Sequence, residues 1–568
     1  MSKPIRHHLQ HLYPQNEVES TYQALLDLIQ QFKSRIPASP EQPLFSERDI
    51  TLITYGDTLR HPHKTPIAAL HQFLQERVGD LVSTVHILPF FPYSSDDGFS
   101  VIDFAAVDPA LGSWQDVSNI ADHYQVMVDL VLNHMSSQSR WFQEFLAGNP
   151  DYADIVITMP PDTDLSSITR PRVSPLLTPY KKSDGQTVYV WTTFSADQID
   201  LNYGSPKTLL RMIEVLLSYV AHGATTIRLD AVAYLWKRVG TTSIHLEETH
   251  RVIQLMRLIL NEAAPQTIII TETNVPHAEN ISYFGNSDNE AQMVYNFTLP
   301  PLLLYTMLTQ NTRQLREWIN TLSAPSDQTT FFNFTASHDG IGVRPLEGIL
   351  GDEALQMMTD VVEQRGGLVS YRNNPDGSRS PYELNITYVD AVIDPSLPPK
   401  LQRKQFILSQ SVAMILAGVP AIYIHSLLGS HNNLDDVERL GYNRAINRTK
   451  LNLTDILAEL DDPNSFRAQV FNHLAMLLKL RAEQPALHPN AAQSTLDLEN
   501  DHILAIFREA PDSGQRLLTL HNFTSDSQTV SLNLDVFQAP IDLITGESLN
   551  LNQIHLPPFA VRWITESP

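Results

Sequence analysis

The sequence contains no cysteine, and this absence excludes several kinds of chemistry at once. Disulfide bonds, thiolate metal sites and cysteine nucleophiles all require a thiol. No apolar run approaches the roughly 18 residues of a membrane span. The first residues, MSKPIRHHLQHLYPQ, also lack the apolar stretch of a signal peptide. We therefore expect a cytoplasmic protein.

Basic residues are scarce relative to acidic ones. The 568 residues include 39 Lys+Arg and 63 Asp+Glu, which gives a formal net charge of −24. A surface of that sign repels phosphate backbones and anionic lipid headgroups, so nucleic acid and membranes are not expected partners. An anionic substrate would need a local cluster of arginines. Internal repeats and glycine-rich nucleotide-binding loops are missing as well.

Short apolar runs rich in β-branched residues recur along the chain. Helical patterns such as SPKTLLRMIEVLLSYVAHG lie between several of them, so the strands must be parallel and joined by crossovers. Eight such runs predict an α/β fold, a (β/α)8 TIM barrel. The runs are 50–55, 83–90, 126–132, 225–230, 267–272, 292–297, 329–334 and 421–426.

The remaining segments are arranged around this barrel. Residues 1–49 are expected to form a helical N-terminal extension, because TYQALLDLIQQF has helical spacing and a Pro-rich linker follows it. The barrel, 50–486, includes a B-domain insertion at about 135–210 after strand 3 and a loop insertion at about 340–400 after strand 7. Both would overhang the C-terminal face, where barrel active sites lie. Alternating runs predict a C-terminal antiparallel β domain at 487–568.

Ionisable or polar residues stand at the ends of four of these runs. Each alone could be a buried ion pair or a solvated loop residue. Because a charged group at a buried strand end costs several kcal/mol unless it is paired or functional, four such ends at one rim indicate one site. The residues are Asn133, His134, Arg228, Asp230, Glu272, His338 and Asp339.

Three converging carboxylates without a cysteine or metal-ligand spacing suit glycosidic bond chemistry. Asp230 is the expected nucleophile, kept ionised by Arg228 on the same face of the strand. Glu272 is the expected acid and base, its pKa raised by neighbouring carboxylates and burial toward roughly 6 to 7. Asp339 would stabilise the oxocarbenium-like transition state, and the two histidines would donate hydrogen bonds to sugar hydroxyls.

These residues lie in motifs that resemble the conserved regions of the alpha-amylase family, glycoside hydrolase family thirteen. DLVLNH, TTIRLDA, TETN and ASHD follow in the family's order, and QIDLN resembles its motif at the end of the B domain. PFFPYSSDDGFSVIDF, TETNVPHAENISYFG and NRAINR narrow the resemblance to the sucrose-phosphorylase branch. It covers roughly residues 50–480.

The resemblance implies a glucosyl-binding subsite and a mechanism. Asp96 would bind the outer hydroxyls of a glucosyl unit, Phe99 would stack near its ring, and Arg448 would join the same subsite. Asp230 would form a β-glucosyl-enzyme in a retaining double displacement. Inorganic phosphate would be the second nucleophile, and α-glucose 1-phosphate the product.

Phosphorolysis requires cations for phosphate in a site that excludes water. Arginines in both insertions could supply them, although any one of them could also be a surface charge. Arg344 is favoured because it follows Asp339 by five residues. The candidates are Arg170, Arg172, Arg344 and Arg379.

Two positions differ from sucrose phosphorylases proper. Asn274 replaces a histidine two residues after the acid, and Glu383 replaces a glutamine. These two residues and Tyr382 are assigned to the acceptor site. The HDGIGVRPLEGIL and NNPDGSRSPYELN segments resemble the phosphorylases of glucosylglycerate and of sucrose 6-phosphate, whose acceptors are anionic. Glucosylglycerate is the preferred substrate, with sucrose 6-phosphate, sucrose and glucosylglycerol left open.

Two other classes of protein remain open: a hydrolase or transglucosidase, and a non-catalytic carbohydrate-binding relative. The second would be expected to have lost a catalytic carboxylate, and all three are present. No cofactor is expected. Many amylases bind calcium near the position of Asn133, but the phosphorylase branch generally does not, so no metal is expected. The expected partners are small molecules, and a homo-oligomer is left open.

Overall fold

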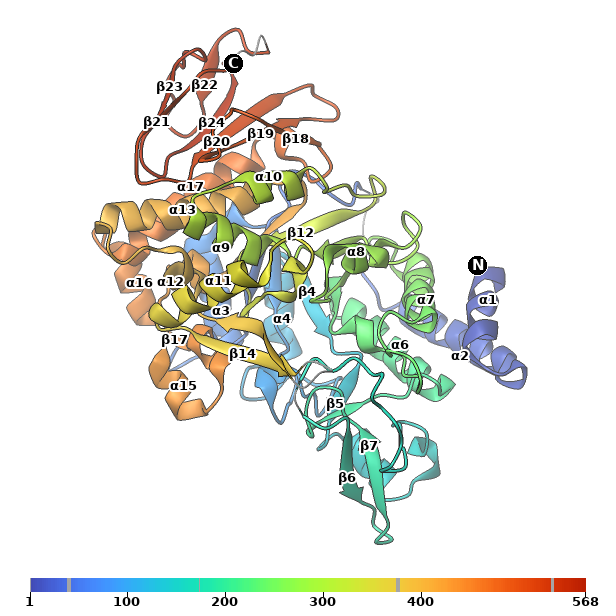
Figure 1. The fold of residues 1–568 in the computed structure, drawn as a ribbon. Helices are drawn as coiled ribbons and strands as arrows, with labels where there is room; N and C mark the ends of the chain where they lie inside the picture. Colours follow the sequence, from blue (N-terminus) through green and yellow to red (C-terminus); the bar gives the residue numbers. More distant parts are fainter. Residues whose placement is uncertain (1, 38–41, 173, 374–377, 533–535, 568) are drawn as a thin grey trace.

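The computed structural model describes residues 2–37, 42–172, 174–373, 378–532 and 536–567. A closed barrel of eight parallel strands lies at its centre (Figure 1). Each strand overlaps one of the runs predicted from the sequence, so the predicted barrel is confirmed. The strands are β1 (Thr51–Thr54), β3 (Thr84–Ile87), β4 (Gln125–Leu130), β9 (Ala224–Leu229), β10 (Ile268–Thr271), β11 (Met293–Tyr295), β12 (Thr330–Phe334) and β16 (Val419–Tyr423).

The strands follow one another around the barrel in chain order, and β1 pairs with β16 to close it. Strands such as β10 are buried along their whole length, because one set of side chains fills the barrel and the other faces the surrounding helices. Two of those helices are α6 (Pro206–Ala221) and α7 (Glu247–Ala263). All eight strands therefore present their C-terminal ends to the same face.

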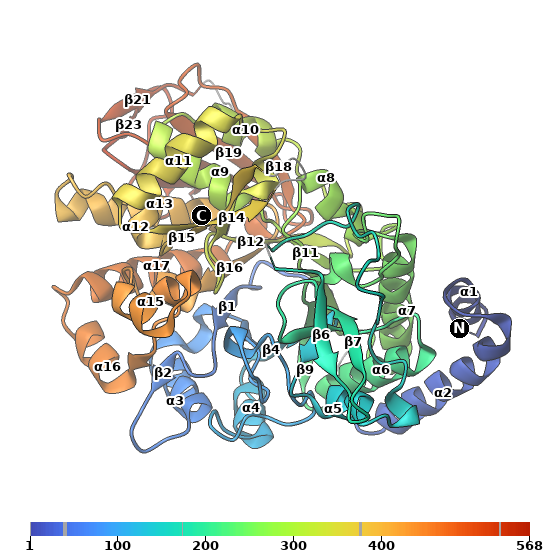
Figure 2. The ribbon, with the colours of Figure 1, turned by 60° about the horizontal axis from the view of Figure 1, so that its bottom comes forward.

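The insertion after β4 forms the predicted B domain. β5 (His134–Ser136) pairs antiparallel with β8 (Gln198–Asp200), and β6 (Leu177–Lys181) pairs antiparallel with β7 (Thr187–Trp191). The first pair returns the chain to the barrel. Figure 2 shows the β6–β7 hairpin in front of the barrel.

The insertion after β12 contributes a small antiparallel sheet. Its strands are β13 (Ile341–Gly342), β15 (Arg379–Asn385) and β14 (Leu368–Asn373), with β15 in the middle. Gly340 permits their close packing, because a Cβ at this position would lie 2.6 Å from Cγ of Glu383 and 2.7 Å from the Leu384 carbonyl oxygen. The sheet therefore brings Glu383 close to the chain that follows Asp339.

Two helices precede the barrel, α1 (Ser2–Leu12) and α2 (Gln15–Lys33), and they pack against α6 and α7 (Figures 1 and 2). The predicted helix at 21–32 lies within α2. The predicted helical extension over 1–49 includes α1, but the sequence does not identify α1 as a separate helix, although its buried residues Ile5, Leu9 and Leu12 have helical spacing. Residues 38–41 of the predicted Pro-rich linker lie outside the described residues.

The C-terminal region is antiparallel, as predicted. Two buried arginines at its junction with the barrel, Arg481 and Arg508, donate hydrogen bonds to backbone carbonyls.

Within the described parts of the chain, no helix combines the length and apolar character needed to cross a membrane. The predicted domain boundaries at 49 and 486 stay predictions. The main sheet of the C-terminal region consists, in spatial order, of β18 (Ala492–Leu496), β19 (Ile503–Glu509), β20 (Arg516–Asn522), β24 (Val561–Glu566) and β22 (Pro540–Asp542).

Candidate active site

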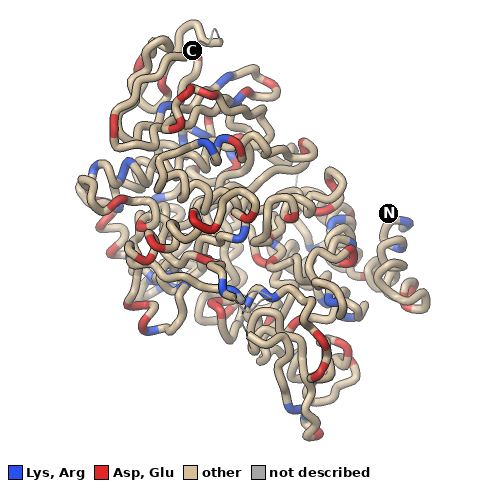
Figure 3. Tube along the Cα trace, viewed as in Figure 1, with Lys and Arg blue, Asp and Glu red and all other residues tan. Residues whose placement is uncertain are grey.

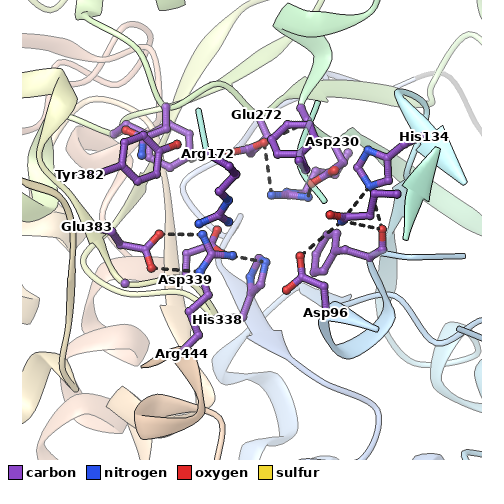
Figure 4. Close-up of a pocket in the computed structure, with 18 residues that line it drawn as sticks. Asp96, His134, Arg172, Asp230, Glu272, His338, Asp339, Tyr382, Glu383 and Arg444 are labelled. Carbon is purple, nitrogen blue, oxygen red and sulfur yellow. Dashed lines mark hydrogen bonds and ion pairs between the residues drawn. The ribbon is translucent and has the colours of Figure 1, made fainter. Parts of the chain in front are cut away.

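A cavity lies where the C-terminal ends of the barrel strands meet the two insertions (Figure 4). The structure brings most of the predicted site residues together around it, including all three predicted catalytic carboxylates. The predicted residues that line it are Asp96, Phe99, His134, Arg172, Arg228, Asp230, Glu272, Asn274, His338, Asp339, Tyr382 and Glu383.

Arg228 and Asp230 form an ion pair at the end of β9. Nη1 of Arg228 donates to Oδ1 of Asp230 at 2.8 Å, as expected for two residues on the same face of a strand. Arg228 also pairs with the buried Asp129 of β4. Burial raises the pKa of Asp230, and Arg228 opposes this shift by favouring the carboxylate. The sequence does not single out Asp129, although an aspartate inside the apolar run VMVDLVL was an available signal.

Glu272 directly follows β10 and has a different environment. Its Oε2 accepts a hydrogen bond from the backbone N–H of Ala231 at 3.0 Å and lies 3.8 Å from Nη2 of Arg228. Ala231 has a left-handed φ of 51°, and this strained turn directs its N–H toward Glu272. Burial, followed by the charges of Asp230 and Asp339, raises the pKa of Glu272 to about 7 against the opposing effect of Arg228. This value agrees with the sequence-based expectation.

Arg444 joins two further carboxylates. Its Nη1 lies 2.5 Å from Oδ1 of Asp339, and its Nε and Nη2 donate to the two oxygens of Glu383 at 2.9 and 2.6 Å. Burial would raise the pKa of both carboxyls, but Arg444 more than offsets it, and both pKa values are lowered. Arg444 stands in the NRAINR segment, from which the sequence selects only Arg448.

Arg448 lies behind the cavity wall. Its Nε donates to the carbonyl oxygen of His338 at 2.7 Å, and its Nη1 donates to Oδ2 of Asp97 at 2.8 Å. The guanidinium also lies 3.7 Å from Oδ1 of Asp96 and from Oδ1 of Asp339. Arg448 therefore supports two cavity residues from outside the space that they enclose.

Both predicted histidines line the cavity. The His338 ring stacks on Phe99, with centroids 4.8 Å apart. Burial and the nearby Arg448 hold the pKa of His338 well below its ordinary value, so the ring is neutral. Nε2 of His134 lies 2.8 Å from the carbonyl oxygen of Phe99. The sequence does not predict three further residues of the lining, Phe194, Gln198 and Phe297. Gln198 opens the QIDLN motif, which was an available signal.

Of the four arginines predicted to bind phosphate or acceptor, Arg172 lines the cavity. Figure 4 shows its side chain extending into the centre, between the Asp230–Glu272 pair and the Glu383–Arg444 pair. Its Cζ lies 6.0 Å from the centroid of the Tyr382 ring. With the residues that the structure describes, Arg172 makes neither a hydrogen bond nor an ion pair, so its donors are available to a ligand.

The other three arginines are not part of the cavity lining. The Arg344 guanidinium lies 4.0 Å from carboxylate oxygens of Glu279 and Glu347. Arg170 is exposed and donates to the carbonyl oxygen of Ser174 at 2.5 Å, and Arg379 is exposed. Their roles stay predictions. Residues 374–377 of the NNPDGSRSPYELN segment lie outside the described residues.

Asn133, where related enzymes bind calcium, faces an ammonium group in this chain. Nζ of the buried Lys237 donates to Oδ1 of Asn133 at 2.6 Å and lies 2.7 Å from Oδ2 of Asp200. The two oxygens that could hold a metal at this point already bind a cation, so these residues do not fit a calcium ion.

Acidic residues outnumber basic ones in the cavity lining, as they do in the whole chain. Figure 3 shows acidic and basic positions interspersed along the trace in this view. The cavity therefore contains arginines without an excess of positive charge. Its acidic residues are Asp96, Asp230, Glu272, Asp339 and Glu383, and its arginines are Arg172, Arg228 and Arg444.

Comparison with known proteins agrees with this geometry. Residues 78–346 match the alpha-amylase catalytic domain. Glucosylglycerate phosphorylase of Spirochaeta thermophila is 44% identical over 580 residues, covering 99% of this chain and 98% of that protein. Glucosylglycerate phosphorylase of Escherichia coli K12 is 44% identical over 565 residues, covering 99% and 100%. The crystal structure of sucrose 6F-phosphate phosphorylase from Thermoanaerobacter thermosaccharolyticum matches with a TM-score of 0.74 at 25% identity, covering 88% of this chain and 98% of that one.

The closed barrel, its B domain and the carboxylate-lined cavity define an enzyme of the class that acts on glycosidic bonds. The chain belongs to the alpha-amylase family, within the group whose members include the glycoside phosphorylases named above. The resemblance seen in the sequence motifs is thereby confirmed.

Proposed function

We propose that the protein is a retaining glycoside phosphorylase that reversibly converts 2-O-α-glucosylglycerate and phosphate into α-glucose 1-phosphate and D-glycerate. Relatives that are 44% identical over nearly the whole chain support this substrate. The structural observation that carries the proposal is the position of Arg172, whose available donors face the catalytic carboxylates. In an acidic cavity, such a group is suited to an anionic ligand.

In the first half-reaction, a carboxylate oxygen of Asp230 forms a bond to the anomeric carbon. The bond from that carbon to the glycerate oxygen breaks, and Glu272 gives its proton to this oxygen. The pKa of Glu272, about 7, keeps much of it protonated at neutral pH. The ionised Asp339 stabilises positive charge on the sugar ring in the transition state.

In the second half-reaction, a phosphate oxygen forms the new bond to the anomeric carbon while the bond to Asp230 breaks. Glu272, ionised since the first step, takes up the proton of the attacking phosphate hydroxyl. Two inversions at one carbon retain the α configuration. Both carboxylates lie within 4 Å of the same Arg228 guanidinium, so they lie close enough together to act on one glucosyl unit.

Arg172 serves both half-reactions in this scheme. Glycerate leaves before phosphate enters, so the two anions occupy the same side of the glucosyl unit in turn. Charge-assisted hydrogen bonds to a desolvated anion contribute about 1.5–3 kcal/mol each. Arg444 reduces the repulsion of that anion, because its ion pairs with Asp339 and Glu383 offset part of their negative charge.

The substrates of this reaction are small molecules. Two of them, inorganic phosphate and α-glucose 1-phosphate, are compatible with a cytoplasmic location for the enzyme. A hydrolase or transglucosidase of the same family would use the same three carboxylates, with water or a sugar hydroxyl in place of phosphate. The two classes differ in phosphate dependence, because a hydrolase releases glucose equally fast without phosphate.

The experiment that tests the proposal is phosphate release from α-glucose 1-phosphate with one acceptor at a time: D-glycerate, glycerol, fructose, fructose 6-phosphate or water. We expect D-glycerate to give by far the fastest release. Asp230→Asn is the control, and it is expected to abolish release without loss of the fold. Equal release with every acceptor, water included, would contradict the phosphorylase assignment.

A further inference from the structure

A carboxylate of the B domain, outside the cavity lining, accepts hydrogen bonds from four serine hydroxyls. Oδ2 of Asp197 accepts from Ser94 and Ser95 at 2.5 Å each and from Ser100 at 2.8 Å. Its Oδ1 accepts from Ser137 at 2.5 Å. Three of these serines belong to the loop after β3 and the fourth follows β5. We call Asp197 and its four serines the serine clamp.

The loop held by the serine clamp, residues 94–100, has an unusual backbone. Asp96, Asp97 and Gly98 have consecutive positive φ values of 52°, 46° and 110°. A Cβ at Gly98 would lie 2.6 Å from the carbonyl oxygen of Pro89. Because residues with side chains adopt this conformation only at a cost in free energy, contacts outside the loop must maintain it.

This loop presents two residues to the cavity, Asp96 and Phe99. The residue after Asp197, Gln198, completes the connection from the B domain. Its Nε2 donates to the carbonyl oxygen of Phe99 at 3.3 Å and lies 3.4 Å from Oδ2 of Asp96. The serine clamp and Gln198 therefore fix both the backbone of the loop and the two side chains at its tip.

We infer that Asp197 is a positioning residue for the glucosyl subsite: its carboxylate holds the 94–100 loop so that Asp96 and Phe99 meet the sugar. The inference rests on the proposed function in that these two residues bind the glucosyl unit. An ionised carboxylate has enough lone pairs for four O–H donors. An amide at the same position keeps one acceptor oxygen but carries no charge, so the hydrogen bonds of the clamp lose their charge assistance.

Asp197→Asn tests the inference with little change in size. Dissociation constants of the free enzyme for D-glucose and for inorganic phosphate are measured by isothermal titration calorimetry. We expect glucose binding to weaken about tenfold, because the loop that carries Asp96 and Phe99 is held less firmly when its anchor loses its charge. Phosphate binding should change by less than twofold, because Arg172 is not in the clamp. Ser95→Ala, which removes one hydroxyl, should weaken glucose binding about threefold.

Asp164→Asn is the matched control. Asp164 is an exposed carboxylate of the same insertion whose oxygen accepts from the backbone N–H of Ser166 in its own turn, so glucose binding should be unchanged. Unchanged glucose binding in both Asp197→Asn and Ser95→Ala would overturn the inference. Equal losses of glucose and phosphate binding in both variants would also overturn it, because they would indicate a general structural role. A wild type that binds glucose but does not use phosphate would contradict the proposed function alone.

Discussion

Asp339 and Glu272, both in the cavity lining, differ in charge state, and their arginine contacts differ in the same sense. Asp339 has Nη1 of Arg444 at 2.5 Å, whereas Glu272 has Arg228 at 3.8 Å. The pKa of Asp339 is accordingly lowered, and that of Glu272 is raised to about 7. One cavity thus holds an ionised carboxylate beside a carboxyl that exchanges its proton at neutral pH, as acid–base catalysis requires.

The pH dependence of the two half-reactions should reflect this difference. The kcat/KM for 2-O-α-glucosylglycerate requires protonated Glu272, so it should fall about tenfold per pH unit above about pH 7. In the reverse direction, kcat/KM for D-glycerate requires ionised Glu272 and should rise with pH. This rise in kcat/KM should occur below pH 7, because Asp230 loses its charge in the glucosyl-enzyme and no longer raises the pKa of Glu272. Initial rates from pH 5 to 9 provide the measurement.

Glu272→Gln is the control for these profiles, and it should remove both limbs together with most of the activity. Limbs that survive in the residual activity of Glu272→Gln would have to come from another group, and the assignment of Glu272 would then be wrong.

Arg172 and Arg344 can be compared as matched arginines. Arg172→Ala should raise the KM for both phosphate and D-glycerate by roughly 10- to 100-fold, as expected for the loss of a charge-assisted hydrogen bond. Arg344→Ala should have a much smaller effect, because its guanidinium lies near Glu279 and Glu347 and outside the cavity lining. Steady-state kinetics distinguish the two. Larger losses in Arg344→Ala would reverse this ranking.

The sequence predicts the catalytic carboxylates because strand periodicity places them at one rim. It does not predict Arg444 or Asp129, whose partners are distant in the chain: Arg444 meets Glu383 across 61 residues, and Asp129 meets Arg228 across 99. Such pairings depend on how β13, β15 and the barrel pack. Arg344 shows the opposite error: it is near Asp339 in the sequence, but its side chain does not line the cavity.

At the scale of elements, the base of the B domain is joined to the barrel by a buried ion pair. Lys237 follows β9 in the chain, and Asp200 ends β8. The side chain of Asp200 is fully buried and that of Lys237 is 2% exposed. Each charge is therefore stabilised by the other, and the ion pair stabilises the β5–β8 strand pair.

Lys237→Met should destabilise the protein by about 3 to 5 kcal/mol, because it leaves the buried carboxylate of Asp200 without its ion partner. Urea unfolding provides the measurement, and Lys207→Met, at an exposed position of α6, is the control with little expected effect. A chelator should not change the unfolding of the wild type. Loss of stability in a chelator, restored by calcium, would contradict the account of this site.

The elements themselves were predictable to different degrees. The apolar runs predict all eight barrel strands because burial on both faces requires them. The β13–β15 sheet was not predictable in the same way, because β13 has two residues and its pairing depends on the contact that Gly340 permits. α1 has a helical pattern, but its packing against α2 and α7 is what distinguishes it from a free segment.

At the scale of the whole molecule, buried arginines connect the C-terminal sheet to the barrel. Arg508 of β19 donates to the carbonyl oxygens of Ile415 and His488 at 2.5 and 2.8 Å, and no carboxylate is among its hydrogen-bond acceptors in the described chain. Burial lowers its pKa to about 9, so it remains protonated at neutral pH. The junction therefore depends on a charge that is satisfied by backbone dipoles.

Arg508→Ala should destabilise the protein by about 3 kcal/mol, because two or more buried carbonyls lose their donor. Thermal unfolding and limited proteolysis at the junction provide the measurements. Arg516→Ala, at the exposed first residue of β20, removes a surface ion pair with Glu509 and should change stability by less than about 1 kcal/mol. Equal effects of the two substitutions would contradict a structural role for the buried arginine.

In the proposed reaction, the protein transfers a glucosyl unit to phosphate in preference to water. Initial rates of formation of α-glucose 1-phosphate and of free glucose from 2-O-α-glucosylglycerate, with and without phosphate, test this claim most directly. We expect α-glucose 1-phosphate in equal amounts with D-glycerate when phosphate is present, and very slow release of glucose when phosphate is absent. Glucose released at the same rate in both conditions would contradict the assignment as a phosphorylase.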